Sequence, residues 1–333
     1  IQKSITETPQ ESIPPTEKRS NDDKNLPHRE NKKWRLLQWR HNKEQGKKIK
    51  SFTSLLTDRF TKKEVIQQEE KQGGEVDETI KKDLQNKEME IAQNVQAKLI
   101  PKIDSNILPG IESSVKTLSC SELSGDVYDF ITQDKNESIF YLGDVTGHGT
   151  AAGLVMTMIN VLTHTIVARS KNIASILITL NREIKPKLAN NMFTTMIMCK
   201  WNAPLRKFSF AGAGHEYILH YHAKTKEIEK IRTGGIAIGM LADISKIVKE
   251  QELFLENDDI VMLYTDGLDE AWDVSGKNRY SLSRLEKDLK ETVHLPSVNE
   301  MSDTIFKRVE TFQGGKALTD DMTLMLFKRS ATR

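Results

Sequence analysis

The sequence predicts an α+β fold, in which a β-sheet core is covered by helices. After Pro101 the chain consists of short apolar runs with the length of strands, separated by turns. Segments with helical spacing of apolar residues lie between some of these runs. Several neighbouring runs are joined by connections short enough for hairpins. Hairpins favour antiparallel pairing, so we expect mainly antiparallel sheets.

The bulk composition indicates a soluble chain with one large domain or two small ones in its 333 residues. Its net charge of +2 predicts no strong overall attraction to nucleic acid. Cys120 and Cys199 lie far apart and lack CxxC spacing, which favours a reducing compartment. The chain begins with the polar segment at Ile1, without an apolar leader. We therefore expect a cytoplasmic location, with membrane association through a segment upstream of Ile1 left open.

The front of the chain differs in texture from the rest. Residues 1–33 are rich in Pro, Ser, Asn, Glu and Lys, and this composition predicts a disordered tail. Residues 34–75 form a basic linker. Within 34–63, tryptophans alternate with Arg and Lys, which is compatible with contact to an anionic membrane surface or an acidic partner. The simpler interpretation is a solvated, partly helical linker. No nucleic-acid-binding module accompanies the patch.

A helical linker is predicted over residues 76–100, ended by Pro101. Apolar residues repeat along one side of it, namely Val76, Ile80, Leu84, Ile91, Val95 and Leu99. Lys87 and Asn94 interrupt a strict heptad, so a coiled coil is compatible with this pattern but not required.

The remaining elements follow in order along residues 101–330. Strands are predicted at 138–142, 194–201, 206–211, 217–221, 259–264 and 322–327, with residues 202–205 as a hairpin turn. Helices are predicted at 150–169, 171–189, 281–291 and 297–312. The most apolar stretch, residues 151–168, is short for a membrane span and contains Asn160 and His164, so we interpret it as a buried helix.

Four aspartates, Asp126, Asp144, Asp266 and Asp321, stand where strand-like runs break. A lone Asp beside Gly is often only a turn residue. Four such positions favour a shared site for hard divalent cations, because Mg²⁺ and Mn²⁺ prefer oxygen ligands. Carboxylates from several strand ends can surround two cations, which one loop cannot do. The carbonyl of Val145 is a further candidate ligand.

Other catalytic patterns are weaker. The helix after Gly149 directs its N-terminus towards Asp144, where its dipole would favour an anionic substrate. His148 and His215 lie in Gly-rich turns, and each is either a proton donor or a turn residue satisfying local hydrogen bonds. Neither has a partner at zinc-ligand spacing along the chain. No GxSxG elbow and no GxxxxGK[ST] loop is present.

From about Glu88 to Phe327 the chain resembles the PPM-type (protein phosphatase 2C-like) serine/threonine phosphatases. It is most similar to the bacterial branch that acts in sigma-factor regulation during stress or sporulation. The matching pieces, in family order, are Ile91-Ala92-Gln93 through Leu99-Ile100-Pro101, Ser124-Gly125-Asp126-Val127-Tyr128-Asp129, Gly143-Asp144-Val145-Thr146-Gly147-His148-Gly149, Ala213-Gly214-His215, Tyr264-Thr265-Asp266-Gly267-Leu268 and Asp321-Met322-Thr323.

The resemblance implies a four-layer α-β-β-α sandwich and a phosphatase that uses two divalent cations, Mn²⁺ or Mg²⁺, with a metal-bound hydroxide and no phosphoenzyme. Carried over by position, Asp144 would bridge both metals with help from the Val145 carbonyl, and Asp126, Asp266 and Asp321 would complete the shells. Asp144 and Asp126 are the expected catalytic residues. Ser124 replaces the commoner Gly, and no counterpart of the phosphate-binding Arg of the eukaryotic enzymes is found.

The expected function is removal of phosphate from Ser or Thr of a small regulatory protein, anti-anti-sigma-like in kind. In this branch the helix before the catalytic domain transmits a signal, often through dimerisation, and residues 76–100 fit that role or simply pack on the domain. Two alternatives remain: a binding module of the same fold with weak catalysis, and a two-metal hydrolase of small phosphate esters.

Overall fold

A computed structural model describes residues 78–215 and 217–330 of this chain. The predicted tail at 1–33, the basic linker at 34–75 and the first two residues of the helix expected at 76–100 lie outside the described residues. The chain divides into two compact units after Leu84. Helix α2 (Glu78–Leu99) begins in the first unit, and the second unit, Gln85–Arg333, contains all the other elements described.

Two five-stranded sheets form the centre of the second unit. The first sheet has the order β1 (Ile111–Leu118), β10 (Met322–Arg329), β9 (Ile260–Tyr264), β6 (Tyr217–His222) and β7 (Glu227–Arg232). The second has the order β2 (Val127–Thr132), β3 (Glu137–Val145), β4 (Thr194–Asn202), β5 (Lys207–Ala213) and β8 (Gln251–Phe254). Every pairing between these strands is antiparallel, which confirms the predicted pairing.

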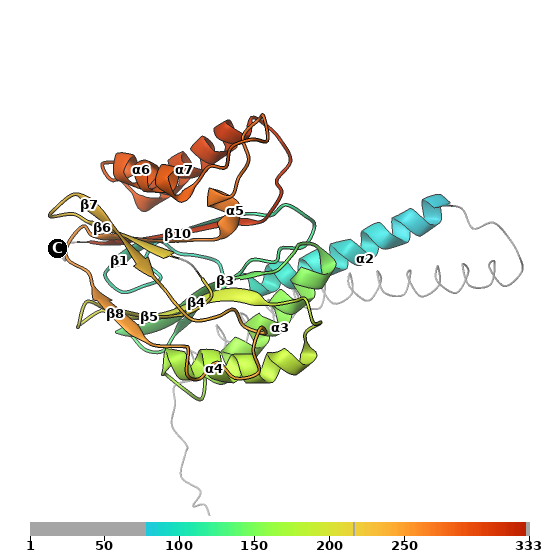
Figure 1. Ribbon diagram of the computed structural model, residues 1–333, viewed down its shortest axis with the longest axis horizontal. Helices are drawn as coiled ribbons and strands as arrows, with labels where there is room; N and C mark the ends of the chain where they lie inside the picture. Colours follow the sequence, from blue (N-terminus) through green and yellow to red (C-terminus); the bar gives the residue numbers. More distant parts are fainter. Residues whose placement is uncertain (1–77, 216, 331–333) are drawn as a thin grey trace, which may run out of the picture. The chain divides into compact units, whose positions relative to one another are not determined.

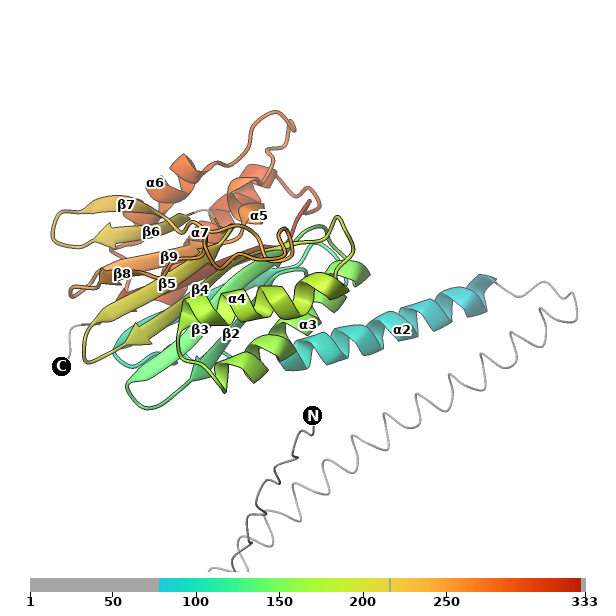
Figure 2. The same cartoon turned by 60° about the horizontal axis from the view of Figure 1, so that its bottom comes forward.

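Helices cover the outer face of each sheet, so the unit has four layers (Figure 1). Helices α6 (Leu282–Thr292) and α7 (Val298–Gln313) lie over the first sheet. Helices α3 (Thr150–Val167) and α4 (Ile173–Ile184) lie side by side on the second, as Figure 2 also shows. The short helix α5 (Asp266–Asp269) follows β9 directly. The expected α+β, four-layer sandwich is confirmed.

Alternating side chains along the strands create three separate cores. On β3, Ile139 and Tyr141 pack under α3 and α4, whereas Phe140 points into the space between the sheets. On β10, Leu326 faces α6 and α7, and Phe327 faces the inter-sheet core. The ring centroids of Phe140 and Phe327 lie 4.9 Å apart. Strands β3 and β10 are therefore apolar on both faces, because successive side chains of an extended chain point to opposite sides.

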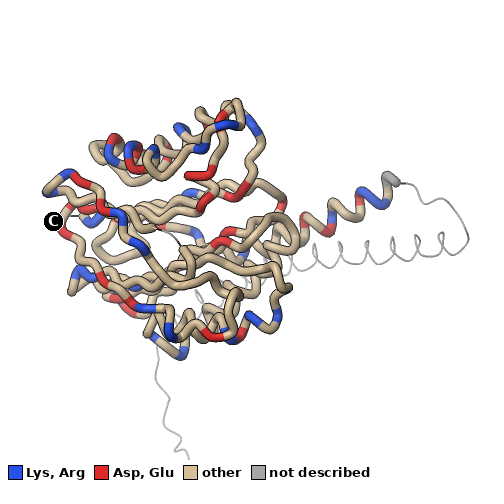
Figure 3. The backbone as a smooth tube through the Cα atoms, viewed as in Figure 1, with Lys and Arg blue, Asp and Glu red and all other residues tan. Residues whose placement is uncertain are grey.

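Helix α3 is the one described helix with the length and composition to cross a membrane. Its buried side chains, including Val155, Met156 and Ile159, belong to the core beneath the second sheet. The apolar run at 151–168 is thus packed within the fold, as expected. The outer helices α6 and α7 carry interspersed charges of both signs (Figure 3).

The predicted set of strands was incomplete. Strands β1, β2, β7 and β8 were missed, and all four lie at sheet edges, where polar side chains mask the period-two pattern. Strand β7, with the sequence EIEKIR, is largely exposed. The helix expected at 171–189 begins at Ile173, where the Asn172 side chain accepts a hydrogen bond from the Ser175 N–H at 2.7 Å, and ends at Ile184. A 3₁₀ turn containing Pro186 follows, because proline cannot continue the α-helical hydrogen bonding.

Candidate metal centre

The four predicted aspartates come from the ends of both sheets. Asp126 precedes β2 and Asp144 lies near the end of β3, whereas Asp266 begins α5 after β9 and Asp321 precedes β10. The charges of Asp126, Asp266 and Asp321 all raise the pKa of Asp144. The structure therefore brings the four carboxylates into one electrostatic cluster where the two sheets meet.

Backbone contacts explain this convergence. A Cβ on Gly267 would lie 2.0 Å from the Asp321 carbonyl oxygen, so only glycine lets α5 approach the start of β10 so closely. A Cβ on Gly125 would lie 3.1 Å from the Val145 carbonyl oxygen. Gly125 thus brings the segment before β2 against the end of β3, where the Val145 N–H donates to the Gly125 carbonyl at 3.4 Å. The glycines next to Asp126 and Asp266 have steric reasons to be there.

Asp126 is almost fully enclosed, with 3% of its surface exposed. Its Oδ2 accepts hydrogen bonds from the hydroxyls of Thr265 at 2.9 Å and Thr323 at 2.6 Å. Burial raises its pKa to about 8, although the two hydroxyls act in the opposite direction. Its Oδ1 is buried and has no hydrogen-bond partner among the described residues. A buried carboxylate oxygen of this kind needs a compensating partner, and a cation would supply one.

Asp144, like Asp126, has a pKa that burial raises. Burial raises its pKa to about 9, and the neighbouring carboxylates, Asp126 first, add to the shift. Two buried carboxyl groups with pKa values above neutrality, beside further carboxylates, cannot both ionise without a positive partner. A divalent cation provides that charge, so the donor set fits hard cations such as Mg²⁺ or Mn²⁺.

Asp321 differs from Asp126 because both its oxygens have hydrogen-bond partners. Oδ1 accepts from the Cys120 N–H at 2.7 Å, and Oδ2 accepts from the Gly125 N–H at 2.6 Å and the Ser124 hydroxyl at 3.1 Å. Asp321 therefore fastens the segment that carries Asp126 to the start of β10. Burial and the charge of Asp321 raise the pKa of the Cys120 thiol to about 11, which makes a thiolate role there unfavourable.

Asp320 is a fifth acidic member that the sequence reasoning did not assign. Its charge raises the pKa of Asp144, with a stronger effect than that of Asp321. Its own pKa is raised, chiefly by burial. The signal was present in the pair Asp320-Asp321, but spacing alone could not tell which of two adjacent carboxylates faces the cluster, since neighbouring side chains point in different directions.

The two histidines occupy different environments. His148 is exposed, and its charge interacts with that of Asp320. His215 is buried, and burial lowers its pKa to about 4, so it is a neutral imidazole near neutral pH.

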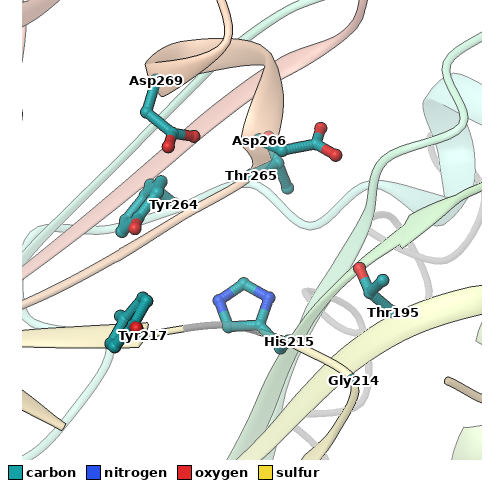
Figure 4. A pocket seen from close by; sticks show the side chains of 8 residues that line it. All are labelled: Thr195, Gly214, His215, Tyr217, Tyr264, Thr265, Asp266 and Asp269. Carbon is teal, nitrogen blue, oxygen red and sulfur yellow. The ribbon is translucent and has the colours of Figure 1, made fainter. Parts of the chain in front are cut away.

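His215 lines a pocket beside Asp266, shown in Figure 4, together with Thr195, Gly214, Tyr217, Tyr264, Thr265 and Asp269. An adjoining pocket shares His215 and adds Arg232, the guanidinium of which lies over the Tyr217 ring at 5.7 Å.

The N-terminus of α3 also belongs to this region. Gly149 caps the helix without a side-chain hydrogen bond, and no acidic residue occurs in its first turn. The free N–H groups and the dipole of a helix start favour an anionic group. In this fold α3 begins a few residues after Asp144 of β3.

Comparisons with known proteins agree with this geometry. A family profile described as stage II sporulation protein E (SpoIIE) matches residues 134–330. Phosphoserine phosphatase RsbU of Bacillus subtilis (strain 168) is 28% identical over 243 residues, which cover 73% of this chain and 70% of RsbU.

Solved structures share the fold at lower identity. The SiaA PP2C domain of Pseudomonas aeruginosa is 21% identical with a TM-score of 0.60, covering 73% of this chain and 96% of that domain. The RsbU and RsbW domains of Rv1364c from Mycobacterium tuberculosis give 22% identity and a TM-score of 0.58 over 68% of this chain. The match spans 62% of that Rv1364c structure.

Proposed function

This chain belongs to the stage II sporulation protein E (SpoIIE) family of PP2C-type phosphatases, and from this premise we propose that it removes phosphate from a phosphoserine or phosphothreonine of a small regulatory protein. It is homologous to a phosphoserine phosphatase, and metal dependence is general in the family. The phosphatase domain is assigned to residues 101–330, which contain all ten strands and the acidic cluster.

One observation carries the proposal: a buried carboxylate oxygen of Asp126, without a partner among the described residues, lies in a cluster where burial and neighbouring carboxylates raise the pKa of Asp126 and Asp144. Such a cluster is costly unless it holds cations. We assign the metal ligands to Asp126, Asp144, the Val145 carbonyl, Asp266 and Asp321. Asp320 is added as a competing candidate for the position of Asp321.

Two divalent cations, Mn²⁺ or Mg²⁺, would supply Lewis-acid polarisation of a phosphoryl oxygen and would lower the pKa of water in the site. The protein's own groups position the reaction. Asp144 and Asp126 supply negative charge at the middle of the metal centre. The hydroxyls of Thr265 and Thr323 fix the Asp126 carboxylate in one orientation. The uncapped N-terminus of α3 offers N–H donors to the phosphate of the substrate.

The proposed substrate is an anti-anti-sigma-like phosphoprotein. Support comes from the relatives: one is named a phosphoserine phosphatase, and another combines RsbU and RsbW domains in one chain. The apolar side of α2 would serve dimerisation, and Val95 on this helix is 47% exposed, which fits a partner surface. The cytoplasm is the proposed location of the reaction.

The test is release of phosphate from a phosphorylated anti-anti-sigma-like protein in the presence of Mn²⁺. We expect Asp144→Asn to lower turnover by at least about 100-fold, because it removes a central charge that stabilises the transition state. A free small phosphate ester serves as the comparison substrate. Unchanged turnover in Asp144→Asn would refute the metal centre, whereas equal rates on the ester and the folded protein would refute the substrate assignment.

A further inference from the structure

A second group of potential metal ligands lies on the first sheet, away from the acidic cluster. His220 and His222 are on β6, and Glu229 is on the neighbouring edge strand β7. The two histidines are two residues apart and therefore face the same side of the sheet. Register places His220 directly opposite Glu229. One ligand atom from each of the three residues lies within 4.8 Å of the others.

The side chains of this group, which we call the β6–β7 histidine cluster (His220, His222 and Glu229), already converge. Nε2 of His222 lies 3.0 Å from a carboxylate oxygen of Glu229. The ring centroids of His220 and His222 are 4.0 Å apart. His222 is five residues beyond Tyr217 of the pocket beside Asp266, roughly 16 Å along an extended strand, so the cluster is distinct from the site above.

Asp259 orients the buried member of the cluster. Nε2 of His220 lies 3.3 Å from Oδ2 of Asp259. That carboxylate is itself fixed by the N–H groups of Ala223 at 2.8 Å and Glu256 at 2.9 Å. A carboxylate that holds one ring nitrogen of a histidine sets its tautomer, and this arrangement accompanies most metal-binding histidines.

The protonation of His220 is compatible with metal binding. A neutral His220 donates its Nε2–H to Asp259, and its Nδ1 then carries the lone pair that a metal requires. Asp259 is only 2% exposed, so its negative charge lies in the protein interior. A cation on the other side of the imidazole would compensate this charge.

We propose that His220, His222 and Glu229 bind one Zn²⁺ ion, with solvent water as the fourth ligand. Two imidazoles and one carboxylate are a donor set that suits Zn²⁺, whereas Mg²⁺ prefers oxygen ligands throughout. His222 and Glu229 are 36% and 57% exposed in their side chains, so the ion can enter from solvent. The ion would tie the exposed edge strand β7 to β6 and stabilise this edge of the sheet.

The test measures zinc binding in the full 333-residue chain, with excess Mg²⁺ present to occupy the acidic cluster. Zn²⁺ is titrated in competition with a chromophoric chelator. We expect one tight equivalent in the wild type, and a loss of affinity of at least about 100-fold in His222→Ala, because one of only three protein ligands is removed. His294→Ala, which alters an exposed histidine outside the cluster, should bind Zn²⁺ like the wild type.

Two further measurements complete the test. Glu229→Gln changes the cluster from the other strand and should weaken Zn²⁺ binding as well, so the proposal stays testable if His222→Ala folds poorly. Co²⁺ added in place of Zn²⁺ should give the visible absorption of a tetrahedral site in the wild type and not in either variant. The proposal is overturned if the wild type binds no Zn²⁺ under excess Mg²⁺, or if both cluster variants bind it as tightly as His294→Ala.

Discussion

The side chain of Gln96 forms two hydrogen bonds with the backbone of Ser124. Its Nε2 donates to the Ser124 carbonyl at 2.8 Å, and its Oε1 accepts from the Ser124 N–H at 3.0 Å. The Ser124 hydroxyl in turn donates to Asp321 and accepts from the Asp126 N–H at 3.2 Å. The last turns of α2 are thus connected through Ser124 to the carboxylate of Asp321 and to the backbone N–H of Asp126.

This connection predicts that Gln96→Ala weakens metal binding by roughly 10-fold, because residues that hold metal ligands in place contribute at that level. The measurement is a titration of phosphate release against Mn²⁺ concentration. Asn94→Ala is the matched control, since Asn94 lies on the same helix and bonds only to the Glu90 carbonyl in the contacts described. If Gln96→Ala and Asn94→Ala require the same Mn²⁺ concentration, α2 does not support the site.

Asp320 and Asp321 should separate into two roles. Asp321→Ala removes the acceptor of two backbone N–H groups and one hydroxyl, so we expect a loss of about 2–4 kcal/mol in the free energy of unfolding without metal. Asp320→Asn should leave that free energy nearly unchanged and reduce metal affinity. Urea unfolding in EDTA and Mn²⁺ titration measure the two effects. Equal stability losses in both variants would contradict this division.

The Thr323 hydroxyl should lower the pH at which Asp126 ionises. This hydroxyl lowers the pKa of Asp126, so Thr323→Val should raise that pKa further above about 8. The pH midpoint of Mn²⁺ binding should move upward by about half a unit to one unit, because the ligand must be ionised. Thr323→Ser keeps the hydroxyl and should keep the wild-type midpoint. A midpoint that is identical in all three proteins would argue against this hydroxyl as a control on the site.

The stability of the metal-free protein should fall as pH rises. In the folded state the pKa values of Asp126 and Asp144 are about 8 and 9, far above the 3.8 of an ordinary aspartate. Between these limits the folded state holds protons that the unfolded chain has released, so this stabilisation is complete below about pH 4 and is lost towards pH 8–9.

Metal should reverse this trend, because binding requires the ionised carboxylates. We expect Tm in EDTA to be lower at about pH 8.5 than at about pH 5.5, and the rise in Tm on adding Mn²⁺ to be larger at the higher pH. Thermal unfolding at both pH values, with and without Mn²⁺, measures both quantities. An equal Mn²⁺ effect at the two pH values would show that these carboxylates do not take up protons in the metal-free protein.

Local patterns in the chain were sufficient for much of the fold. Continuous apolar runs identified β3, β4, β9 and β10, because neighbouring residues such as Phe140 and Tyr141 make a buried strand apolar on both faces. Helical spacing located α3, α6 and α7. The polar edge strand β7 was missed, since only Ile228 and Ile231 are partly buried, each on a different face, and its other side chains are charged.

The motifs also indicated that Asp126, Asp144, Asp266 and Asp321 share a site, and the structure brings them together. Packing of the two sheets determines which side chains surround these aspartates. Asp126 receives its hydroxyl donors from Thr265 and Thr323, which are 139 and 197 residues away along the chain. The pairing of His220 with Glu229 likewise depends on strand register. Short-range patterns record which residues are apolar or turn-forming, whereas hydrogen bonds and pKa shifts depend on neighbours that only the packed chain supplies.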